Sequence, residues 1–182
     1  MRKQVILAVV AVFLCGLLGT SLARSQQGPP KPGPEHEKLA YFAGTWLSEG
    51  EAKASPYGPA GRFAFRETCE WFEGRFALLC RSEGKFGDIP IKGISVMSYD
   101  PTEKKYIYFE SNSLGENELS HGTVNGDTWT WNGQNKGPDG KPIHGRFTLK
   151  QVSADVATYR FEMGPSGDSL ALVMEGKQTR QK

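Results

Sequence analysis

The sequence predicts an all-β domain: a single antiparallel, up-and-down β-barrel of about ten strands with a short N-terminal helix. From Trp46 onward, apolar and polar residues alternate with a period of two in short runs. Gly, Pro, Asn and Asp separate the runs, and Asn125-Gly126 is typical of a tight type I′ hairpin turn. No run that would suit a long helix lies between them. A barrel that closes on itself removes the edges that an open sheet would expose.

The first 25 residues have the composition of a secretory signal peptide. Arg2 and Lys3 form a basic start, residues 5–18 are apolar, and small residues suited to cleavage follow. We therefore expect residues 1–25 to be removed on export to the bacterial periplasm. Residues 26–34 contain four prolines and are expected to form a flexible lead-in to the barrel domain at 35–182. The apolar run is short for a membrane helix, so no membrane segment is expected after cleavage.

Removal of the signal peptide changes the net charge of the protein. The chain has 22 basic and 20 acidic residues. Arg2, Lys3 and Arg24 lie in the expected signal peptide and no acid does, so 19 basic residues remain against 20 acids, a net charge of −1. This near-neutral domain offers no electrostatic surface for nucleic acid or anionic lipid.

The elements follow in order along the chain. Residues 35–42 are predicted to form one or two helical turns, because Pro34 suits a helix start and Gly44 suits a stop. Trp46 stands at the head of the first strand, where it is expected to lie at the closed end of the barrel. The strands are predicted at residues 45–54, 61–72, 75–85, 90–99, 105–111, 117–124, 127–132, 143–151, 156–163 and 169–178.

Alternation indicates which side chains of the second and third strands point inward. The apolar members of this face are Phe63, Phe65, Trp71, Phe76 and Leu78. Glu67 is the polar exception, which requires either a solvated cavity or an arginine partner. Cys69 and Cys80 share the face across the turn at 72–75, so a disulfide is expected in an oxidising compartment. Two buried thiols packed as small hydrophobic groups are the alternative.

Motifs for catalysis or metal binding are weak in this chain. His36, His121 and His144 are far apart in the sequence, so no metal site is predicted, and a pairing of His121 with His144 across strands is left open. No Gly-x-Ser-x-Gly nucleophile elbow occurs, and no second carboxylate can be paired with Glu67. Enzymatic activity, which would use Glu67 and His121, therefore has little support.

The chain resembles a bacterial family known as domain of unknown function 1579. The resemblance is carried by residues 44–51, 67–71, 74–76, 99–101, 105–106, 173–176 and 180. That family is similar to the calycins, the lipocalin-like barrels, in which a tryptophan after the N-terminal helix packs near an arginine from the chain end. The resemblance thus implies that Trp46 and Arg180 close the barrel.

Residues 44–50 are also similar to the Gly-x-Trp-x-Gly-x-Gly motif of the nitrobindin-like haem barrels. Ser48 replaces the middle glycine, and no histidine lies in the last strands, His144 being the nearest. No haem or other cofactor is therefore expected. We expect a small apolar or amphipathic ligand inside the barrel, in contact with the apolar wall, Glu67 and His121. The alternatives are a barrel packed solid with its own aromatic residues and a haem-binding barrel.

Overall fold

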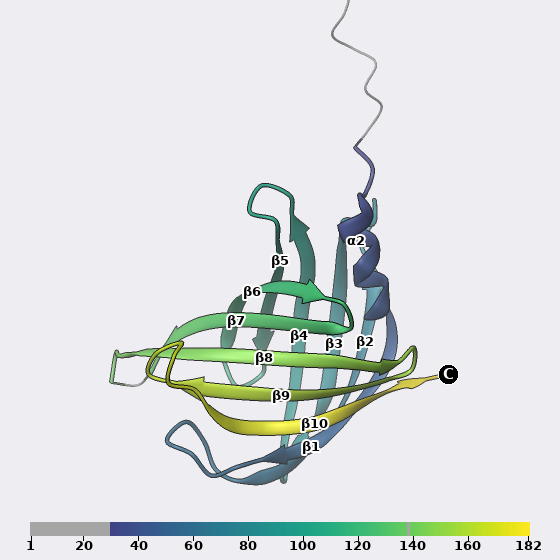
Figure 1. The fold of residues 1–182 in the computed structure, drawn as a ribbon. Coiled ribbons are helices and arrows are strands. Elements are labelled where there is room, and N and C mark those ends of the chain that lie inside the picture. Colours follow the sequence, from purple (N-terminus) through teal and green to yellow (C-terminus); the bar gives the residue numbers. More distant parts are fainter. Residues whose placement is uncertain (1–29, 138) are drawn as a thin grey trace, which may run out of the picture. The chain divides into compact units, whose positions relative to one another are not determined.

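Ten antiparallel strands form a closed barrel in the computed structural model, which describes residues 30–137 and 139–182 (Figure 1). Each strand pairs with the next along the chain, and the last pairs with the first. The predicted up-and-down barrel is therefore confirmed. The expected signal peptide and the lead-in as far as residue 29 lie outside the described residues. The strands are β1 (Gly44–Ala52), β2 (Gly61–Trp71), β3 (Ala77–Phe86), β4 (Ile89–Asp100), β5 (Lys105–Asn112), β6 (Asn117–Asn125), β7 (Thr128–Lys136), β8 (Pro142–Ser153), β9 (Val156–Gly164) and β10 (Ala171–Gln181).

Most strand boundaries differ from the predicted ones by one or two residues, and three of the differences have a clear physical reason. β3 begins at Ala77 rather than at 75, because Gly74 and Arg75 form the turn with positive φ angles of 82° and 59°. β7 continues four residues beyond 132, since its polar second half pairs with β8. β10 continues beyond 178 to Gln181, because it pairs with β1 as far as Thr45.

A short helical segment precedes the barrel. α2 (Pro34–Lys38) continues into the 3-10 turn η1 (Leu39–Tyr41), so the segment begins one residue before the predicted span of 35–42 and ends one residue before its end. Proline suits the first helical position, because its φ angle is already close to the helical value. Leu39 is fully buried in the barrel core, and the segment closes one end of the barrel (Figure 1).

Aromatic side chains fill the interior at this helix end. The rings of Trp129 and Trp131 stack with centroids 6.0 Å apart, and Tyr106 and Phe42 pack edge-on against Trp129 at 4.7 and 4.9 Å. Such large side chains contribute most of the apolar area that a core buries. This half of the interior is therefore packed solid with the protein's own aromatic residues, as one of the alternatives proposed.

Candidate functional site

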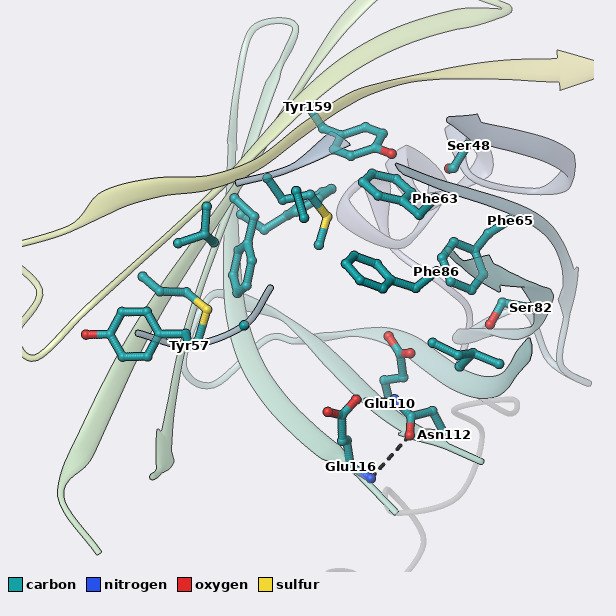
Figure 2. Close-up of a pocket in the computed structure, with 18 of the residues that line it drawn as sticks. Ser48, Tyr57, Phe63, Phe65, Ser82, Phe86, Glu110, Asn112, Glu116 and Tyr159 are labelled. Carbon is teal, nitrogen blue, oxygen red and sulfur yellow. Dashed lines mark hydrogen bonds between the residues drawn. The ribbon is translucent and has the colours of Figure 1, made fainter. Parts of the chain in front are cut away.

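The other half of the barrel contains a cavity of about 580 Å³ (Figure 2). Tyr57 in the β1–β2 connection and Leu114 in the β5–β6 connection contribute to its lining, so it lies toward the end opposite α2. A cavity of this size suits one small molecule.

Aromatic rings from non-adjacent parts of the barrel form the apolar wall. Phe63 lies 6.1 Å from Phe65 on β2 and 6.3 Å from Tyr159 on β9, measured between ring centroids. Phe147 on β8 continues the row at 5.4 Å from Tyr159. Figure 2 shows Phe63, Phe65 and Phe86 grouped together, and Glu110 and Glu116 grouped in another part of the cavity.

A polar side of the cavity runs across β2 to β5. Glu67 on β2 faces Ser82 on β3, and Ser82 pairs with Gly93 on β4. A Cβ added at Gly93 would lie 2.6 Å from Ser82 Oγ and 3.3 Å from Glu110 Oε1. The absent side chain therefore leaves the space in which Ser82 and Glu110 approach each other. Tyr108 donates a hydrogen bond from its hydroxyl to Glu110.

The carboxylates of this side affect one another because they are removed from bulk water. Burial, and then the charge of Glu110, raises the pKa of Glu67 to about 7. The same two causes raise the pKa of Glu118, which pairs with Glu110 in the β5–β6 register. Burial and the charge of Glu110 also raise the pKa of Tyr108, so its hydroxyl stays protonated as a donor.

The structure brings only part of the predicted cavity wall into the cavity. Phe63, Phe65 and Glu67 line it. Of the remaining predicted wall residues, Leu78 is fully buried in the solid half of the barrel. Trp71 packs against the same core with the guanidinium of Arg75 4.6 Å from its ring, and Phe76 contacts His36 at 5.2 Å. The alternation of apolar and polar residues predicts which face of the sheet these side chains share. It does not predict their position along the barrel axis.

The structure places both later histidines away from the cavity. The side chain of His121 is 45% exposed, and its Nε2 lies 3.8 Å from Glu103 Oε2. Its neighbours Ser120 and Gly122 are buried, so His121 lies on the outer face. His144 precedes Gly145 on β8, and the positions of Gly145 and Phe147 face inward. His144 does not belong to the cavity lining. Glu67 and His121 therefore do not meet at one site.

Cys69 and Cys80 are joined by a disulfide with an S–S distance of 2.02 Å, directly across the β2–β3 ladder. One ligand atom from Glu67 and the two sulfur atoms lie within 4.8 Å of one another. Among the described residues this is the only such group of three, and the disulfide already uses both sulfurs. The arrangement therefore does not offer thiolate ligands to a metal ion.

Trp46 and Arg180 lie at the helix end, away from the cavity. The Arg180 guanidinium carbon is 4.2 Å from the centroid of the Trp46 ring, and the two residues are partners in the β1–β10 register. Both belong to the strands that close the barrel.

Sequence reasoning missed several residues of the polar side. Ser82, Tyr108 and Glu110 line the cavity, and of the cavity carboxylates only Glu67 stands out in the sequence as an exception to a pattern. A signal does exist for Glu110, because it follows Tyr106 and Tyr108 at a period of two in one predicted strand.

Comparisons with known proteins agree with the barrel. A family model described as "Protein of unknown function (DUF1579)" matches residues 31–180. The fold is similar to that of Rv2717c from M. tuberculosis, with 14% sequence identity and a TM-score of 0.56, over 82% of this chain and 99% of that chain. It is also similar to the S-type phycobiliprotein lyase CPES from Guillardia theta, with 13% identity and a TM-score of 0.58, over 81% and 93%. At these identities the likeness shows the fold alone.

The remaining searches add two facts. No curated protein matches the chain in sequence. In the part of the chain that the structure describes, no helix has the length and apolar character needed to cross a bilayer.

Proposed function

Because the chain belongs to the DUF1579 family, whose description names no activity, we propose a function from the cavity: the barrel binds one small apolar or amphipathic molecule. The observation that carries this proposal is the cavity of about 580 Å³, with aromatic rings on one side and carboxylates on another. Rings supply apolar contact area, and a few polar groups fix the orientation of a ligand. Phe63 and Phe65 contribute to the apolar contact, and Glu67 contacts the polar end.

The proposal includes export to the periplasm. Residues 1–25 act as a signal peptide, residues 26–34 connect it to the barrel, and residues 35–182 form the binding domain. The disulfide between Cys69 and Cys80 supports this location, because disulfides persist in oxidising compartments.

A fluorescent probe tests binding directly. N-phenyl-1-naphthylamine is an uncharged dye whose emission rises in apolar surroundings, and we expect saturable binding with one site per chain. Ala52→Trp places an indole at the mouth of the cavity, where Ala52 belongs to the lining. This change should weaken probe binding about tenfold or more, because it removes space that the probe needs.

The matched control is Ala64→Trp, which adds the same indole to an exposed position of β2. It should leave probe binding unchanged. Equal effects of the two substitutions, or emission that never saturates, would show that the dye binds elsewhere. Native mass spectrometry of protein from its own periplasm then identifies what the cavity carries.

A further inference from the structure

The charges that line the cavity are unequal. Three carboxylates, from Glu67, Glu110 and Glu116, belong to its lining, against one cationic side chain, Lys53. Lys53 is already engaged, since its Nζ lies 3.2 Å from Glu175 Oε1. Among the ion pairs of the described residues, none includes Glu67 or Glu110. Glu67 and Glu110 therefore place two carboxyl groups in the cavity without a protein cation paired to either.

A buried hydroxyl next to these acids also lacks a partner. Ser95 is 5% exposed, and its Oγ has no hydrogen-bond partner among the residues described. Its register places it between Cys80 on β3 and Glu110 on β5, on the inward side of the sheet. A buried polar group without a partner is costly. Ser95 adds to that cost beside the polar side of the cavity, although it does not itself belong to the cavity lining.

We propose that the polar end of the ligand is a protonated amine, bound between Glu67 and Glu110 with its apolar body against the aromatic wall. This inference rests on the proposed function and adds the chemical class of the ligand. Three features of the cavity match such a molecule. Two carboxylates supply opposite charge, the Ser82 hydroxyl is a further acceptor, and aromatic faces attract cations.

The energetics of the cavity carboxylates also favour an amine. Burial and Glu110 disfavour the ionised form of Glu67, and raise its pKa to about 7. A bound ammonium ion would offset that repulsion, because an opposite charge at short range favours the ionised carboxylate. A ligand carboxylate, which can only accept hydrogen bonds, would instead require Glu67 to be protonated.

The two kinds of ligand therefore respond to pH in opposite ways. The groups near Glu67 are the disulfide sulfurs of Cys69 on β2 and Cys80 on β3, Ser82 on β3, and Tyr108 and Glu110 on β5. Glu118 on β6 lies beside Glu110, and Trp46 and Ser48 on β1 do not titrate in this range. None of them is a cation. Affinity for an amine should rise as pH increases through 7, whereas affinity for an acid should fall.

The experiment compares three probes that share an indole ring: tryptamine, tryptophol and indole-3-acetate. Isothermal titration calorimetry of the mature protein measures each at about pH 6 and about pH 8, over which tryptamine stays charged. At the higher pH we expect tryptamine to bind at least about tenfold more tightly than tryptophol, because its ammonium group can form charge-assisted hydrogen bonds with the carboxylates. Its affinity should fall severalfold at the lower pH.

Isosteric variants locate the effect. Glu67→Gln and Glu110→Gln should each remove most of the preference for tryptamine over tryptophol. The control is Glu70→Gln, at an exposed position of the same strand as Glu67. Two separate variants keep the test decisive if one of them folds poorly.

The outcomes separate the two proposals. Equal binding of tryptamine and tryptophol would overturn the amine and leave the binding function standing. Tighter binding of indole-3-acetate, strongest at the lower pH, would also overturn the amine in favour of an acidic ligand. If neither these probes nor the naphthylamine dye bind, both proposals fail.

Discussion

Glu67 is a single carboxyl group whose ionised form the folded protein disfavours. Burial and Glu110 raise its pKa from 4.5 to about 7. Between these values the folded chain binds a proton at this group more readily than the unfolded chain does. Stability therefore falls as pH rises through this window, because the native state must give up a proton that it holds more tightly.

Glu67→Gln should remove this dependence. The difference in unfolding free energy, variant minus native protein, should increase as pH rises from about 4.5 to about 7. The increase should reach up to about 3 kcal/mol, since one pKa unit corresponds to about 1.4 kcal/mol. Urea unfolding at several pH values measures the difference. Glu70→Gln on the same strand serves as the control. A difference between native protein and Glu67→Gln that stays constant with pH would contradict the environment assigned to Glu67.

The disulfide joins β2 to β3 beside the cavity. Cys69 and Cys80 are 11 residues apart and are direct partners in the ladder. Mature protein, unfolded without reductant, should therefore show no free thiol on titration, and two after reduction. The short closed loop should make the bridge worth about 2 to 3 kcal/mol in unfolding experiments. Two free thiols before reduction would rule the bridge out.

The strands could be predicted from sequence because most of them repeat one local pattern between turn residues. The turn between β6 and β7 lies where it was predicted but is not the expected type I′ turn at Asn125-Gly126. Asn125 ends β6 and pairs with Thr128, so the two loop residues are Gly126 and Asp127, and of these only Gly126 has a positive φ, of 58°. The second half of β7 escaped the same reasoning. Its residues are polar and become a strand only because β8 pairs with them.

The candidate site was harder to predict than the strands. Glu67 stands out because it interrupts the apolar face of one strand. Glu110 lies on β5, with β3 and β4 between it and β2, so its approach to Glu67 depends on the closure of the whole sheet. Leu78 shares the face of Glu67 but lies in the solid half. A period of two identifies the side of a sheet, and position along the barrel axis comes from register.

The barrel combines a solid half and a hollow half. The helix end supplies the buried aromatic core, with Trp129 1% exposed and Leu78 fully buried. Charged groups in the hollow half lower stability, as the pKa of Glu67 indicates. The solid half can compensate for that cost, because one network of hydrogen-bonded strands runs through both. Closure of the sheet is therefore a requirement of the cavity as well as of the fold.

Closure depends on the contact between β1 and β10 at the helix end. Trp46 is 2% exposed, and its indole N–H donates to the carbonyl of Phe42 at 3.1 Å. The guanidinium of Arg180 lies over the indole ring and donates to the carbonyls of Tyr41, at 2.8 Å, and Ala43. One side chain from the last strand thus contacts both the first strand and the segment that closes the barrel.

A double-mutant cycle tests whether this pair acts as a unit. Trp46→Ala should cost about 3 to 5 kcal/mol of unfolding free energy, as for other large residues removed from a core. Arg180→Ala should cost about 1 to 2 kcal/mol through the lost cation–π contact and hydrogen bonds. The double variant should lose less than the sum, because either single change already removes their mutual contact. Urea unfolding of the four proteins supplies the cycle. Strictly additive losses would mean that Trp46 is a core residue independent of Arg180, and that the backbone ladder between β1 and β10 closes the barrel without this side-chain pair.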